Sequence, residues 1–248
     1  MSLNQIMRIA VILIGIIIVI KFLLFLFGGS KDELSKSIAA DHIVNVDVST
    51  DIGDIQIAPH DGHDIRVQLE GKTTKKPSKK FKLTLKEKNG EVIIKAKTKS
   101  RFLSFRKLSD GYTILVELPT KQYDRLLVHA DVANIYVDSI YANESQTTTN
   151  VGNINLIGIG GVINAQSEVG DITISLQSIA NNIQAKTEVG NIAVKTKEAP
   201  LALQTDINNS VGNKTINLPN EAGGSIGIGG PNVKLTVAVG NVSLSLSD

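Results

Sequence analysis

The sequence predicts an all-β protein: a parallel β-solenoid of about six to seven short coils with an inserted antiparallel hairpin unit, preceded by one transmembrane helix. Three observations predict this fold. A short phrase recurs along the chain, made of an apolar residue, Gly, Asn or Asp, and another apolar residue. Its copies follow one another at intervals near twenty residues. One long apolar run lies near the N-terminus.

The apolar run covers residues 9–27, and Lys21 is its one charged residue. As a helix it would be about 29 Å long, which matches the hydrocarbon core of a bilayer. Lys21 can extend to the lipid headgroups. A cleaved signal peptide is the alternative, but apolar sequence resumes after Lys21. We therefore expect an uncleaved anchor with a short tail over residues 1–28, and a polar linker over 29–41.

The surroundings of the anchor indicate a location. Lys and Arg are nearly balanced on its two sides, so the positive-inside rule gives little orientation. A short tail before a long soluble part favours a single-pass protein of the cell membrane with its soluble domain outside the cytoplasm. The chain has no Cys, which excludes disulfides, thiolate metal sites and lipid attachment through cysteine.

The recurring phrase defines a solenoid domain over residues 42–248. Apolar or small residues alternate with polar ones on both sides of each Gly, as in Ala185, Thr187 and Val189, and then Ile192 and Val194. This period of two around a two-residue turn predicts strand, turn and strand. Gly accepts positive φ, and Asn or Asp tolerate the left-handed region. The predicted structural turns are Gly53, Asp54, Gly152, Asn153, Gly170, Asp171, Gly190, Asn191, Gly212, Asn213, Gly240 and Asn241.

The spacing of the copies decides how the strands pair. From Ala133 to Gly212 the central position recurs after 19, 18, 20 and 22 residues. Such a repeat favours pairing of each strand with its equivalent one coil away, rather than with its neighbour in a local hairpin. Stacked Asn and Asp side chains would then form a polar ladder along the turn edge. The last spacing is 28 residues, which predicts a flexible loop at 223–230 before the final strand pair.

The phrase is missing between its first two copies. There, two alternating runs at 81–86 and 92–97 flank Asn89-Gly90, which is a strong hairpin signal. A third strand is expected at 112–118. We interpret residues 71–118 as a basic antiparallel insertion that covers one end of the stack, since bare strand edges recruit other chains.

Positive charge is concentrated in this insertion. Residues 71–109 carry 14 Lys or Arg against two Glu, whereas the remaining chain is net acidic. One interpretation is a solvated hairpin whose lysines protect an edge strand. The other is contact with an anionic surface, such as phospholipid headgroups or teichoic-acid phosphates. The candidate contact residues are Lys72, Lys75, Lys76, Lys79, Lys80, Lys82, Arg101, Phe102, Phe105, Arg106 and Lys107.

No catalytic motif is present: the sequence has no phosphate loop, nucleophile elbow or dinucleotide fingerprint. The segment from His60 to Asp64 is the densest group of potential metal ligands, but it has the composition of a polar turn. We predict no metal, no other cofactor and no nucleic-acid partner. A glycan-processing enzyme is the alternative function, although the carboxylates are scattered singly and no Arg follows Asn134.

The segments Val116-Glu117-Leu118-Pro119 and Leu126-Leu127-Val128, with the serial copies of the phrase, resemble a bacterial family of β-strand-repeat proteins known as putative adhesins. LiaG-like members, which occur beside cell-envelope-stress genes, are the most similar. The resemblance runs from about Ile43 to the C-terminus and implies no catalytic residue. We therefore expect a noncatalytic, membrane-anchored, adhesin-like envelope protein linked to envelope stress, which contacts a protein partner or an anionic polymer or lipid.

Overall fold

The computed structural model describes residues 34–71, 81–98 and 112–247. The predicted anchor at residues 1–28 lies outside these ranges. Within them, no helix is long and apolar enough to cross a membrane. Every regular element that the structure describes is a β-strand.

The strands of the first half are β1 (Leu34–Ala39), β2 (Asn45–Ile52), β3 (Asp54–His60), β4 (Asp64–Gly71), β5 (Phe81–Lys88), β6 (Glu91–Thr98), β7 (Tyr112–Pro119), β8 (Gln122–Val132), β9 (Ile135–Asp138) and β10 (Tyr141–Val151). The strands of the second half are β11 (Ile154–Ile157), β12 (Gly160–Val169), β13 (Ile172–Leu176), β14 (Ile183–Val189), β15 (Ile192–Thr196), β16 (Leu203–Val211), β17 (Lys214–Asn217), β18 (Ser225–Ile226), β19 (Asn232–Val239) and β20 (Val242–Leu246).

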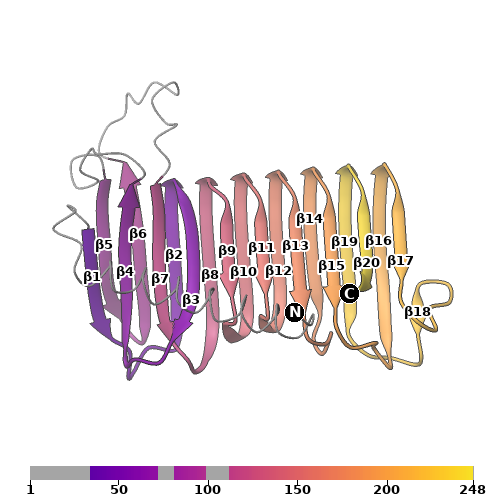
Figure 1. Cartoon of the computed structure of the whole chain (residues 1–248), viewed down its shortest axis with the longest axis horizontal. Coiled ribbons are helices and arrows are strands. Elements are labelled where there is room, and N and C mark those ends of the chain that lie inside the picture. Colours follow the sequence, from indigo (N-terminus) through magenta and orange to yellow (C-terminus); the bar gives the residue numbers. More distant parts are fainter. Residues whose placement is uncertain (1–33, 72–80, 99–111, 248) are drawn as a thin grey trace, which may run out of the picture. The chain divides into compact units, whose positions relative to one another are not determined.

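These strands form two sheets of ten strands each. Both sheets extend along the long axis of the domain, and their strands lie across it (Figure 1). Sheet A has the order β1-β4-β7-β3-β9-β11-β13-β15-β20-β17, and sheet B the order β18-β16-β19-β14-β12-β10-β8-β2-β6-β5. A coil such as β12–β13 gives one strand to each sheet. Equivalent residues pair in parallel, so that Ile154 lies beside Ile135 on one side and Ile172 on the other. The predicted pairing one coil away is confirmed.

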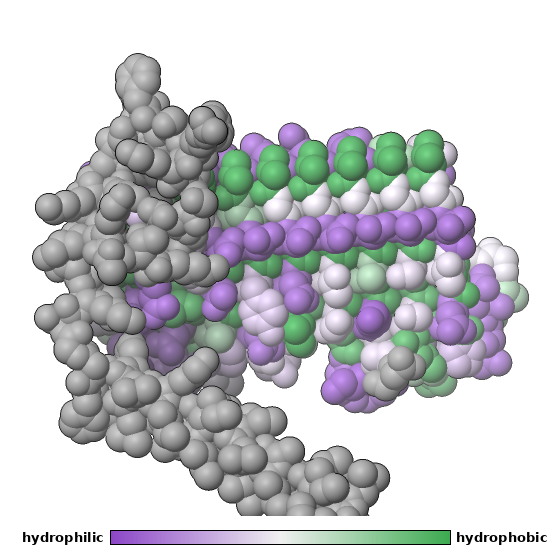
Figure 2. All heavy atoms as spheres, turned by 45° about the horizontal axis from the view of Figure 1, so that its top comes forward, coloured by the Kyte–Doolittle hydropathy of each residue, from purple (hydrophilic) through white to green (hydrophobic). Residues whose placement is uncertain are grey.

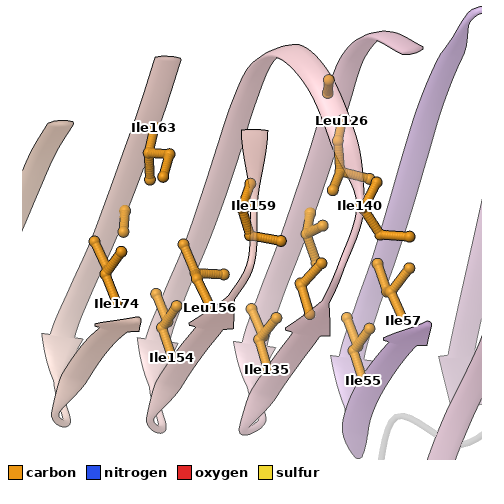
Figure 3. Close-up of a cluster of buried hydrophobic side chains, with 14 of the residues drawn as sticks. Ile55, Ile57, Leu126, Ile135, Ile140, Ile154, Leu156, Ile159, Ile163 and Ile174 are labelled. Atoms are coloured by element: carbon orange, nitrogen blue, oxygen red, sulfur yellow. The ribbon is translucent and has the colours of Figure 1, made fainter. Parts of the chain in front are cut away.

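The core lies between the two sheets. Ile135 and Ile154, two inward residues of the short sheet-A strands, are each 1% exposed. They meet inward residues of sheet B, among them Leu126 and Ile163 (Figure 3). Burying one such side chain contributes roughly 1.5–3 kcal/mol relative to exposure. Repetition of these contacts from coil to coil stabilises a domain with few aromatic residues.

Antiparallel pairing is found at the N-terminal end of the stack. β5 and β6 form the predicted hairpin, and Asn89 and Gly90 have φ values of 53° and 75°, as a tight hairpin turn requires. β6 and β7, however, stack in parallel on β2 and β3. The insertion thus contains a coil of the solenoid, and the added antiparallel neighbours are β5 on β6 and β4 on β7.

β1 comes from the segment predicted to be a linker. It pairs antiparallel with β4 and forms the edge of sheet A. Leu34 and Ile38 on this strand are partly buried against the core. These two apolar residues, spaced for one face of a strand, explain why the segment is ordered.

The other end of the stack departs from sequence order. β19–β20, the last strands of the chain, lie between β14–β15 and β16–β17. In Figure 1 the yellow strands are therefore inside the orange-yellow ones. The predicted loop at 223–230 contains β18, which pairs antiparallel with β16. It carries the chain around β16–β17 so that the final strands can enter the stack.

Candidate functional site

The predicted contact residues fall mostly outside the described part of the chain. Lys72, Lys75, Lys76, Lys79, Lys80, Arg101, Phe102, Phe105, Arg106 and Lys107 all do so. Lys82 is described: it lies on β5, the edge strand of sheet B, and its side chain is exposed. The hairpin β5–β6 is therefore where the structure gives the geometry of the basic region.

Lysines of this hairpin share the outer face of sheet B. Leu83, Ile94 and Ala96 point into the core. The alternating positions consequently face outward, and they include five lysines. Lys88 lies opposite Glu91 in the register, and we call the other four, Lys82, Lys86, Lys95 and Lys97, the lysine face. Lys82 lies directly opposite Lys97 in the antiparallel register. Two like charges in this position repel each other.

Few acidic groups compensate the lysine face. Lys95 Nζ lies 3.8 Å from the Asp47 carboxylate. Burial raises the pKa of Asp47, and the charge of Lys95 opposes that effect. In the part of the chain that the structure describes, Lys82, Lys86 and Lys97 have no ion-pair partner. These three lysines can therefore accept an external anion without first breaking an internal ion pair.

The Gly-Asn and Gly-Asp corners form a continuous ladder on another edge of the domain. The backbone N–H of each Asn or Asp donates to the side-chain oxygen of the preceding residue in the ladder, with N–O distances of 2.7–3.1 Å. In spatial order the ladder is Asp54, Asn134, Asn153, Asp171, Asn191, Asn241 and Asn213. Asn and Asp can both supply the accepting oxygen, but at three steps the side-chain amide of Asn134, Asn191 or Asn241 also donates to the preceding side chain, which Asp could not do.

The sequence interpretation of these corners needs two corrections. The ladder residues do not have positive φ; the described non-Gly residues that do are Asn89, Ser139 and Asn220. The glycines do have positive φ, but they have a second reason to lack a side chain. At Gly170 (φ 151°), a Cβ atom would overlap the carbonyl oxygen of Gly152 in the next coil.

The alternation predicted that the valine before each corner glycine faces inward, but in the structure this valine faces outward. Val189 is 49% exposed, and its equivalents are similarly exposed. The parallel pairing in sheet B skips one residue just before the corner, between Thr187 and Val189. This skip reverses the alternation of inward and outward side chains. Figure 2 shows the result as parallel green, pale and purple rows along the domain.

The turn from His60 to Asp64 uses its histidine locally. His60 Nδ1 accepts a hydrogen bond from the Gly62 N–H at 3.0 Å, and Nε2 lies 2.6 Å from the Asp64 carbonyl oxygen. A hydrogen bond from Arg66 lowers the pKa of the Asp64 carboxyl group. Throughout the described ranges, no group of three or more His, Cys, Asp or Glu side chains could hold a metal ion.

A buried tyrosine, Tyr123 at the start of β8, has a raised pKa. Tyr123 is 1% exposed, and its hydroxyl donates to the Pro119 carbonyl oxygen at 3.0 Å. Burial raises the pKa of Tyr123 to about 12. Lys121 Nζ lies 5.3 Å from the centre of the ring and donates to the Ala40 carbonyl oxygen. Burial also lowers the pKa of Lys121. This arrangement fixes the entry to β8 and involves no candidate ligand site.

Comparison with known proteins gives the chain a family. Two overlapping segments, residues 43–162 and 123–245, match the sequence profile of a family described as Toastrack DUF4097. The chain belongs to the Toastrack DUF4097 family. A comparison with functionally curated proteins gave no match.

Solved structures resemble this Toastrack chain. A protein from Clostridium sporogenes, described as a "putative cell adhesion protein", has a TM-score of 0.55 at 14% identity, over 87% of this chain and 99% of that one. A protein from Bacteroides fragilis, described as a "putative adhesin", has a TM-score of 0.37 at 12% identity, over 87% of this chain and 98% of that one. At these identities the first likeness is one of fold alone. The resemblance to adhesin-like β-strand-repeat proteins is confirmed.

Proposed function

We propose that this Toastrack protein is a noncatalytic, membrane-anchored, adhesin-like module of the cell envelope that binds phosphate groups through its basic hairpin. The observation that carries the proposal is the lysine face, in which Lys82 and Lys97 lie opposite each other without an acidic partner among the described residues. A bound phosphate would relieve this repulsion. Next to anionic lipid, each lysine contributes on the order of 1 kcal/mol.

The position of the hairpin supports an envelope ligand. β5 and β1 are the edge strands of the two sheets at the same end of the domain. The predicted anchor precedes β1 in the chain. Lipid headgroups and teichoic-acid phosphates are the two phosphate sources for a domain outside the cytoplasm. If the amount of either ligand changes under envelope stress, binding by the protein changes with it, which would link the protein to that stress. The Clostridium protein, which has a similar fold, is described as a putative cell adhesion protein, and this supports an adhesin-like role.

The proposal is tested with the full chain in neutral phosphatidylcholine nanodiscs. Two ligands distinguish the phosphate sources: fluorescent poly(glycerol phosphate) and vesicles that contain phosphatidylglycerol. We expect the variant Lys82→Gln/Lys86→Gln/Lys97→Gln to bind the preferred ligand at least about tenfold more weakly, since three cations contribute on the order of 1 kcal/mol each.

A matched control has the same loss of charge elsewhere. Lys195, Lys197 and Lys214 are also exposed and lie at the C-terminal part of the stack. Substituting all three by Gln should leave binding within about twofold, because the Debye length is about 8 Å at physiological salt. Equal losses in the two triple variants, or no binding of either ligand by the parent chain, would refute the proposal.

The noncatalytic part of the proposal has its own test. Wall polysaccharide incubated with the protein should keep its chain length, as measured by size-exclusion chromatography. Shortening that disappears on substitution of a single carboxylate would instead identify a glycan-processing enzyme.

A further inference from the structure

A notch interrupts the edge opposite the Asn/Asp ladder, where each coil turns from sheet A back to sheet B. Its position follows from the unequal coil lengths. Two residues, Gly158 and Ile159, connect β11 to β12, whereas six residues, 177–182, connect β13 to β14. The longer connection projects beyond the shorter one and leaves a hollow of about 200 Å³ beside it.

Tyr141 forms the opposite wall of this hollow. It starts β10, and the parallel register places it directly beside Gly160 of β12. A Cβ atom on Gly160 would come within 2.9 Å of Tyr141 Cδ1, so the aromatic ring occupies the space that the missing side chain leaves. The tyrosine is nevertheless 52% exposed, so its ring presents a free face to solvent.

The other lining residues combine an apolar floor with polar amides. Ile159, Ile163, Leu176 and Ile183 are buried at the base, and Gln177, Ser178 and Asn181 are exposed on the longer connection. Gln177 Nε2 donates to Glu198 Oε1 at 2.8 Å. Within the described ranges, the side chains of Ser178 and Asn181 have no hydrogen-bond partner. They are free to bond to a ligand.

We propose that this notch binds one pyranose ring of a neutral glycan. The aliphatic C–H face of such a ring packs against an aromatic face such as that of Tyr141, while Ser178 and Asn181 are placed to bond to its hydroxyl groups. Drug-sized ligands occupy roughly 300–1,000 Å³, so the smaller hollow suits a single ring.

The composition of the notch disfavours other ligands. None of its lining residues is charged, which gives a phosphate no counter-ion. A peptide strand would need a free backbone edge, but β10, β12 and β14 are each paired on both sides. The notch is thus separate in chemistry and position from the lysine face, and the glycan proposal goes beyond the phosphate-binding function.

The test uses the full chain in neutral nanodiscs and saturation-transfer NMR with two oligosaccharides. Tetra-N-acetylchitotetraose represents N-acetylated glycans and cellotetraose represents unsubstituted ones. We expect at least one of them to bind. Tyr141→Ala should weaken that binding by about tenfold or more, equivalent to about 1.4 kcal/mol. Tyr141→Phe, which keeps the ring, should retain most of it.

Two further variants separate a binding role from a structural one. Gly160→Ala should weaken sugar binding because the new methyl group displaces the Tyr141 ring, with little change in circular dichroism. Tyr136→Ala, on the outer face of sheet A, is the matched control and should bind normally. The Lys82/Lys86/Lys97 triple variant should also bind the sugar normally, so the two proposals can fail independently. Absence of binding to both sugars, or full binding by Tyr141→Ala, would overturn the proposal.

Discussion

Corner glycines illustrate how one residue type meets two demands. Gly152, Gly170 and Gly190 have positive φ, and each lies where a Cβ atom would overlap a carbonyl oxygen of the neighbouring coil. That carbonyl oxygen also accepts a hydrogen bond from a buried hydroxyl group: Thr187 Oγ1 donates to the Gly170 oxygen at 2.9 Å. The small residue and the buried threonine therefore belong to one packing arrangement between coils.

Substitution of one corner glycine tests this arrangement. Gly170→Ala should lower the free energy of unfolding by at least about 3 kcal/mol, because the methyl group meets backbone that cannot move aside. Gly223→Ala is the control: Gly223 also has positive φ (61°), but nothing lies within 4 Å of its Cβ position. It should lose only about 1 kcal/mol from backbone strain. Urea unfolding measures both, and equal losses would contradict the steric account.

Tyr123 provides a test through pH. Its pKa is raised to about 12 in the folded protein, against about 10 in the unfolded chain. The neutral hydroxyl thus stabilises the fold fully below pH 10, and this stabilisation is lost as pH rises toward 12. The loss is about 2–3 kcal/mol at 1.36 kcal/mol per pKa unit. Urea unfolding between pH 9 and 12 should show a shallower decline for Tyr123→Phe than for the parent. Identical declines would exclude this role.

At the scale of elements, the order of the last strands follows their polarity. Inward residues of β19 are Val233, Leu235 and Val237, all at most 1% exposed. Asn209 of β16 pairs with Val237 and is an inward polar residue. A solenoid needs a polar coil at its end and apolar coils within. Placing β19–β20 inside β16–β17 satisfies this requirement.

Paired substitutions test the terminal role of β16. Leu235 and Ile207 are register partners in adjacent strands, but Leu235 is fully buried and Ile207 only partly. Leu235→Asn should cost about 3 kcal/mol or more. Ile207→Asn should cost less than half as much, as measured by urea unfolding. A larger loss for Ile207→Asn would mean that β16 is not a terminal coil.

This end of the stack also marks the limit of prediction from sequence. The spacing of the Gly-Asn phrase was sufficient to predict coils, parallel pairing and the ladder, because each follows from a local repeat. The 28-residue spacing before Gly240 gives only the length of a connection. The position of β19–β20 depends on which coils have polar inward residues. The period of the repeat does not give this information, because it is the same for polar and apolar coils.

The two candidate sites differ in predictability for the same reason. The concentration of lysines around Asn89-Gly90 could be recognised from the sequence alone. The register of the hairpin then placed Lys82 opposite Lys97. The Tyr141 notch arises from a two-residue connection next to a six-residue one. The unequal connections contribute to the spacings of 18 and 20 residues between corner glycines. The hollow could be recognised only from the register, which places Tyr141 beside Gly160.

The described domain is a stack of coils whose surface chemistry differs from one place to another. The lysine face lies at the end that carries β1 and β5, and the neutral notch lies along the turn edge among β10, β12 and β14. A rigid parallel stack keeps such surfaces at fixed separations. We propose that the lysine face binds phosphate groups by charge.

The most direct measurement of this claim is the salt dependence of poly(glycerol phosphate) binding by the full chain in neutral nanodiscs. Each phosphate contact that a lysine makes releases a counter-ion, so log K should fall linearly with log[NaCl]. We expect a clearly shallower slope for the Lys82/Lys86/Lys97 triple variant and an unchanged slope for the Lys195/Lys197/Lys214 control. A parent slope near zero, or equal slopes in the two variants, would contradict it.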